Sequence, residues 1–85
     1  MRLSELRYGQ SAKIRDIMGQ DALSIRLIDL GFLPPARVIK TFSAPGGNPM
    51  AVRLRGYTLS LRREEADRVL GEMETGAFLP KQTTT

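Results

Sequence analysis

The chain has 85 residues, of which 41% are hydrophobic, and its 13 Lys and Arg against 9 Asp and Glu give a formal net charge of +4. This size suits one small domain with one modest core. The absence of Cys excludes a disulfide framework, and the absence of His removes the commonest general base and transition-metal ligand. No apolar run resembles a signal peptide or the ~20 residues of a membrane-spanning helix, so we expect a cytoplasmic protein.

The first part of the chain predicts a short turn followed by a strand. Leu3 and Leu6, three residues apart, favour a single helical or 3₁₀ turn. Residues 11–17 then alternate apolar and charged side chains, which is typical of a half-buried strand. Ile17 breaks this alternation, so we expect a bulge or bend near Asp16.

Residues 22–30 predict one short amphipathic helix. Its apolar face is formed by leucines at positions i, i+4 and i+7, namely Leu23, Leu27 and Leu30. Ile25 and Ile28 are expected to flank and broaden this face. Asp21 is positioned to cap the first turn, and Gly31 can take the positive φ that ends a helix.

Three further strands are predicted over residues 36–43, 50–55 and 57–61, with a tight turn at Arg55-Gly56. The strand patterns place Phe42 and Tyr57 at positions that we expect to face the core. Residues 62–70 favour a short helical turn, and the alternative for residues 69–73 is a last short strand. We expect one domain over residues 1–75 and a flexible tail over 76–85. Four or five short strands with one inserted helix favour a small barrel.

Two patterns that could hold ions are better explained structurally. The loop Gly46-Gly47-Asn48 leads into a strand, whereas a phosphate cradle leads into a helix N-terminus. The carboxylates of Glu64, Glu65 and Asp67 lie among arginines that oppose a cation. We therefore expect no metal site, no cofactor and no catalytic residue, and hence no enzymatic activity.

Two surfaces are candidates for binding a partner. An apolar groove between helix and barrel would be lined by Leu23, Leu27, Leu30, Phe32 and Leu33, although these residues are also natural core. A basic face on the predicted hairpin would comprise Arg53, Arg55, Arg62 and Arg63. The groove suits a protein partner, whereas the basic face suits nucleic acid or another acidic surface.

Several short motifs follow one another in a fixed order along residues 1–73. They are Leu3, Leu6 and Gly9; Arg26-Leu27; Leu30-Gly31 with Pro34; Pro45-Gly46-Gly47-Asn48-Pro49; Leu61-Arg62; and Glu65-Ala66. In this order and spacing they resemble the FeoA family. The chain departs from the family pattern in two places: the family usually has Pro-Gly after the Leu-Gly, where this chain has Pro34-Pro35-Ala36, and Asn48 replaces the usual Asp.

The resemblance implies a mainly β, SH3-like barrel of about five strands with one inserted helix and a short C-terminal helical turn. It also implies a non-enzymatic accessory protein of bacterial ferrous iron uptake, whose partner is the cytoplasmic part of the FeoB-type membrane GTPase permease. Such a protein would be peripheral to the membrane through its partner, a monomer or weak oligomer, and without a stable nucleic-acid complex. The alternative is a nucleic-acid-binding or transcription-regulator-associated barrel that uses the arginine face. The domain type also resembles the C-terminal module of iron-dependent repressors.

Overall fold

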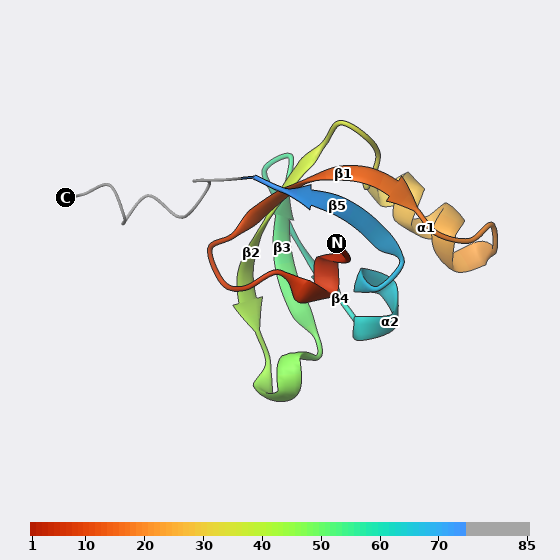
Figure 1. The fold of residues 1–85 in the computed structure, drawn as a ribbon. Helices are drawn as coiled ribbons and strands as arrows, with labels where there is room; N and C mark the ends of the chain where they lie inside the picture. Colours follow the sequence, from red (N-terminus) through yellow and green to blue (C-terminus); the bar gives the residue numbers. More distant parts are fainter. Residues whose placement is uncertain (75–85) are drawn as a thin grey trace.

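The structure is a computed structural model that describes residues 1–74, and it contains one antiparallel five-stranded sheet with a helix, α1, beside it (Figure 1). The elements in chain order are the 3₁₀ turn η1 (Leu3–Glu5), β1 (Ser11–Ile17), α1 (Ala22–Leu30), β2 (Arg37–Ser43), the turn η2 (Pro45–Gly47), β3 (Met50–Leu54), β4 (Tyr57–Leu61), α2 (Arg63–Ala66) and β5 (Val69–Met73). The strand order is β4-β3-β2-β1-β5, so the last strand crosses over to pair with the first. The predicted tail, residues 76–85, lies outside the described residues.

Most predicted elements are confirmed, and the open choice near the C-terminus is resolved. The helical turn α2 ends at Ala66, and the chain then forms a separate strand, β5, from Val69. The β3–β4 connection is a two-residue turn in which Arg55 and Gly56 both have positive φ, 55° and 85°. This conformation matches the right-handed twist of the two strands that it joins. Among the described residues, no helix is long and apolar enough to cross a membrane.

Two irregularities in strand pairing bend the sheet. The first lies between Ile14 and Asp16 in β1, where the broken alternation predicted it. The second lies between Lys40 and Phe42 in β2. A bulge adds one residue to one strand and increases its local twist, which lets a small sheet curve around its own core.

The expectation that Phe42 and Tyr57 belong to the core is wrong. Their exposed fractions are 55% and 71%. Val38 and Lys40 point inward from β2, and the bulge after Lys40 reverses the alternation, so that Phe42 points outward. Tyr57 is the first residue of β4, an edge strand that has a neighbour on one side only.

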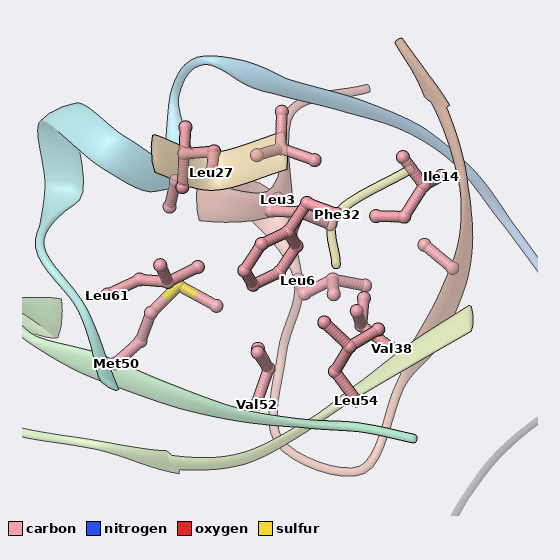
Figure 2. Close-up of a cluster of buried hydrophobic side chains, with 13 residues drawn as sticks. Leu3, Leu6, Ile14, Leu27, Phe32, Val38, Met50, Val52, Leu54 and Leu61 are labelled. Carbon is pink, nitrogen blue, oxygen red and sulfur yellow. The ribbon is translucent and has the colours of Figure 1, made fainter. Parts of the chain in front are cut away.

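A single apolar core fills the interior of the curved sheet. It comprises Leu3, Leu6, Ala12, Ile14, Leu27, Phe32, Val38, Met50, Val52, Leu54, Leu61, Ala66 and Val69. Figure 2 shows the Phe32 ring in the middle of the labelled side chains, between residues of the sheet and Leu27 of α1. The segment that leaves α1 therefore supplies the centre of the core.

One lysine is buried with these apolar residues. Lys40 is 8% exposed, and its Nζ donates a hydrogen bond to the backbone oxygen of Leu6 at 2.9 Å. Burial lowers the pKa of the Lys40 ammonium below its ordinary value. The backbone of Lys40 also pairs with Gly9 and Gln10, so this residue holds the N-terminal segment against β2.

Candidate protein-binding surface

Helix α1 begins and ends as its flanking residues predict. The Asp21 carboxylate accepts a hydrogen bond from the backbone N–H of Ser24 at 3.2 Å, which makes Asp21 the N-cap. Gly31 takes a φ of 110°, and its N–H donates to the Ile28 carbonyl. The Phe32 N–H then donates to the Leu27 carbonyl, which turns the Phe32 side chain back toward the barrel.

The five residues predicted to line an apolar groove do not form one surface. Leu27 and Phe32 are 1% and 0% exposed and belong to the core. Leu23 is partly buried against the same core. Leu30 and Leu33 are about two-fifths exposed, at 41% and 40%, and are available to a partner.

The structure exposes two further apolar residues that the sequence analysis placed beside the buried face. Ile25 is 56% exposed and Ile28 is 39% exposed. At 100° per residue, Ile25 lies about 160° around the helix from Leu27, and Ile28 lies about 100° from it. The buried face includes Ser24 instead, whose hydroxyl donates to the Asp21 carbonyl. The angular position of Ile25 was the signal that could have identified it as exposed.

Polar contacts hold α1 against the segment around α2. Both Asp21 oxygens accept hydrogen bonds from the Arg68 guanidinium, at 2.7 and 2.8 Å, and the Met18 N–H donates to the Arg68 carbonyl. The Arg68 guanidinium and the Ser24 N–H hold the pKa of the Asp21 carboxyl well below its usual range, and the same pairing raises the pKa of Arg68. These contacts fix the orientation of α1, and with it the exposed apolar residues of the helix, relative to the segment around α2.

This pairing leads to a prediction for Asp21→Asn, which keeps an N-capping oxygen but removes the charge. We expect a lower melting temperature at neutral pH. Since the pKa of Asp21 is depressed on folding, the stabilisation is complete above the unfolded value near 3.8 and is lost as the pH falls below it. Thermal unfolding followed by circular dichroism from pH 7 to pH 2 should show the variant and the wild type converging in acid.

Glu72→Gln is the matched control for this prediction. Glu72 pairs with Arg15 through one contact of 3.0 Å, and both side chains are more than half exposed. Such a pair contributes little, so this variant should melt close to the wild type. Equal effects of the two substitutions would contradict a special role for the Asp21–Arg68 pair.

The four arginines of the predicted basic face are all exposed but are not gathered in one patch. Arg53 and Arg55 lie at the turn end of the β3–β4 hairpin, whereas Arg62 and Arg63 follow the opposite end of β4. The length of β4, about 16 Å, separates the two pairs. The Arg63 guanidinium donates to the Gly46 carbonyl, and the Arg53 guanidinium lies 3.4 Å from the Gly56 carbonyl.

The two patterns considered as ion sites, the glycine loop and the carboxylate cluster, make contacts within the fold. The glycine loop forms η2 and leads into β3 rather than into a helix. Four carboxylates near the C-terminal strand have partners of their own, namely Glu65 with Arg26, Asp67 with Ser4, Glu72 with Arg15 and Glu74 with Arg37, while Glu64 is exposed. Within residues 1–74, no group of three acidic, His or Cys side chains is arranged to hold a metal ion.

This curved antiparallel five-stranded sheet with one inserted helix is an SH3-like fold. Residues 1–73 match the FeoA domain family. The chain belongs to that family, and its fold is the SH3-like one printed for a solved FeoA structure.

Three related proteins illustrate the likeness. A Porphyromonas gingivalis Fe(2+) transport protein A/Fe(2+) transporter FeoB fusion protein is 34% identical over 73 residues, which is 86% of this chain and 9% of that protein. The solution structure of Clostridium thermocellum iron(II) transport protein A has a TM-score of 0.81 at 30% identity, covering 86% of this chain and 45% of that one. The crystal structure of Stenotrophomonas maltophilia FeoA with zinc, a procaryotic SH3 domain protein, has a TM-score of 0.77 at 34% identity over 85% and 89% of the two chains.

This chain therefore spans less than half the length of the first two relatives. The fold also extends to a manganese-dependent transcriptional repressor, with a TM-score of 0.79 at 16% identity over 87% of this chain and 36% of that one. At that identity the likeness concerns the fold alone.

Proposed function

We propose that this protein is an accessory factor of bacterial ferrous iron uptake that acts in the cytoplasm by binding the cytoplasmic part of a FeoB-type permease. The observation that carries the proposal is the Porphyromonas gingivalis relative, in which the matching domain is fused to a FeoB transporter. Fusion holds two domains at a high effective concentration, which is useful when they bind each other.

The exposed aliphatic side chains of α1 and its exit support a protein partner. Ile25, Ile28, Leu30 and Leu33 are 39–56% exposed. They extend from a helix that is capped at both ends and held to the barrel by Asp21 and Leu27. Apolar side chains presented on a rigid element are typical of protein-binding surfaces.

The test is binding of the purified cytoplasmic domain of a FeoB-type permease from the same organism, measured by calorimetry. The double variants Ile25→Ser/Ile28→Ser and Leu30→Ser/Leu33→Ser examine the two sides of α1. At least one should weaken binding about tenfold, the loss expected for a central contact residue. Because these residues are partly exposed, the double variants should remain folded.

Phe42→Ser is the matched control, because Phe42 is equally exposed but lies on β2. It should leave the affinity unchanged. Wild-type affinity in both double variants would show that α1 is not the docking surface, and no binding by the wild type would refute the proposed function.

A nucleic-acid-binding role remains the second candidate, because Tyr57 and Phe42 are exposed where they were expected to be buried. Tyr57 follows the turn that carries Arg55, and aromatic residues beside cations are typical of single-strand binders. The separation of the four arginines argues against a continuous basic track. Steeply salt-dependent binding of single-stranded RNA or DNA, abolished by Tyr57→Ser, would favour this candidate.

A further inference from the structure

A small pocket lies where α1, the end of the β2–β3 connection and the β4–α2 junction meet. Its volume is about 270 Å³, and it is lined by Arg26, Pro49, Ser60, Leu61, Arg62 and Glu65. Sites for drug-sized ligands and cofactors occupy ~300–1,000 Å³. This pocket therefore has room for one or two side chains or a small anion.

The charges that line the pocket leave an excess of positive charge. Glu65 is already engaged, since its Oε1 accepts from the Arg62 backbone N–H at 2.8 Å and its Oε2 lies 3.5 Å from Nη1 of Arg26. The Glu65 side chain is only 13% exposed, whereas that of Arg26 is 67% exposed. The 3.5 Å contact is longer than an ordinary hydrogen bond, so Arg26 keeps donors for a ligand. Within residues 1–74, the Arg62 guanidinium forms no ion pair.

The surroundings of the pocket are apolar as well as cationic. The partly exposed Pro49 contributes aliphatic surface, the buried Leu61 closes the bottom of the pocket, and the exposed Ser60 supplies a hydroxyl. Leu30 follows Arg26 by four residues, so the two side chains are neighbours on the same side of α1. Leu30 is 41% exposed, so it offers an apolar side chain one helical turn beyond Arg26.

We propose that this pocket receives an Asp or Glu side chain from an acidic, partly apolar segment of the partner protein. The carboxylate would lie between the guanidiniums of Arg26 and Arg62 and accept from the Ser60 hydroxyl, while an adjacent apolar residue packs on Leu30. The inference rests on the proposed function, in which the ligand is a protein. A single negative charge suits two arginines beside one carboxylate, whereas Glu65 would repel the second charge of a phosphate dianion.

The test is an NMR titration of the ¹⁵N-labelled protein with the peptide acetyl-Glu-Leu-Glu-Leu-amide. Shifts should concentrate on Arg26, Ser60, Arg62 and Glu65, and the peptide with Gln in place of Glu should produce none. Arg62→Gln should weaken binding about fivefold, the upper range for one exposed ion pair. Arg53→Gln, an exposed arginine at the other end of the hairpin, should bind like the wild type.

Several results would overturn the proposal. They are equal binding of the Gln peptide, tighter binding of inorganic phosphate than of the Glu peptide, shifts centred elsewhere, and no shifts at all. Arg62→Gln should fold normally, because its backbone N–H still donates to Glu65. A melting temperature equal to that of the wild type confirms that any loss of binding comes from the missing charge.

The permease measurement separates this inference from the proposed function. If the wild type binds the permease domain and Arg62→Gln binds it equally well, the pocket is not the contact, and the proposed function stands. If the wild type does not bind that domain, the proposed function fails. The peptide titration then still shows whether the pocket binds a carboxylate side chain.

Discussion

Phe32→Ala should lower the free energy of unfolding by about 3–5 kcal/mol, the largest effect of any substitution considered for this chain. The ring is fully buried and lies in the middle of the core, surrounded by side chains from the sheet and α1 (Figure 2). Its removal loses apolar burial and leaves a cavity that the hydrogen-bonded sheet cannot close. Small domains have ~5–15 kcal/mol of stability in all, so the variant should be marginally folded.

Urea unfolding measures this effect as a lower midpoint with an unchanged slope. Phe42→Ala is the matched control, because it removes the same side chain from a site that is 55% exposed, and it should cost about 0.5 kcal/mol or less. Leu27→Ala, at another buried position, should cost about 2–5 kcal/mol. If Phe32→Ala unfolded at the same urea concentration as Phe42→Ala, the position of Phe32 at the centre of the core would be wrong.

Gly31→Val should lower the free energy of unfolding by about 1–3 kcal/mol. Gly31 has a φ of 110°, which L-residues rarely adopt, and a Cβ at this position would lie 3.3 Å from Cδ2 of the buried Leu54. Val adds two branches to that Cβ, so it combines backbone strain with crowding in the core. Differential scanning calorimetry should show a lower melting temperature.

Gly31→Asn provides the comparison, because Asn tolerates positive φ better than β-branched residues do. The melting temperature of Gly31→Asn should lie between those of the wild type and Gly31→Val. If Gly31→Val melted at the same temperature as the wild type, Gly31 would not need its positive φ. Because Phe32 follows Gly31 directly, this turn also directs the core aromatic inward.

The candidate site was predictable only in part. The sequence analysis grouped Leu30 and Leu33, which are partly exposed, with Leu27 and Phe32, which are buried in the core. A helical stripe identifies residues that could be buried, and the neighbouring elements decide how many of them are. The pocket lined by Arg26, Pro49 and Arg62 joins three distant segments, and no local pattern indicates it.

The sequence by itself determined the features that depend on near neighbours along the chain. Asp21 and Gly31 bound α1 because capping and positive φ are properties of a few consecutive residues. The alternation of residues 50–54 and the Arg55-Gly56 turn defined the hairpin for the same reason. The motifs that resemble the FeoA family likewise identified the SH3-like fold.

Only the tertiary structure decided which face of a strand points into the core and which groups far apart in the sequence come into contact. The bulge in β2 turned Phe42 outward and left Lys40 inside, since its position depends on pairing with β3. The contact of Asp21 with Arg68 spans 47 residues. Periodicity measures a side chain's direction relative to its own element, whereas burial and pairing are set by whatever packs against that element.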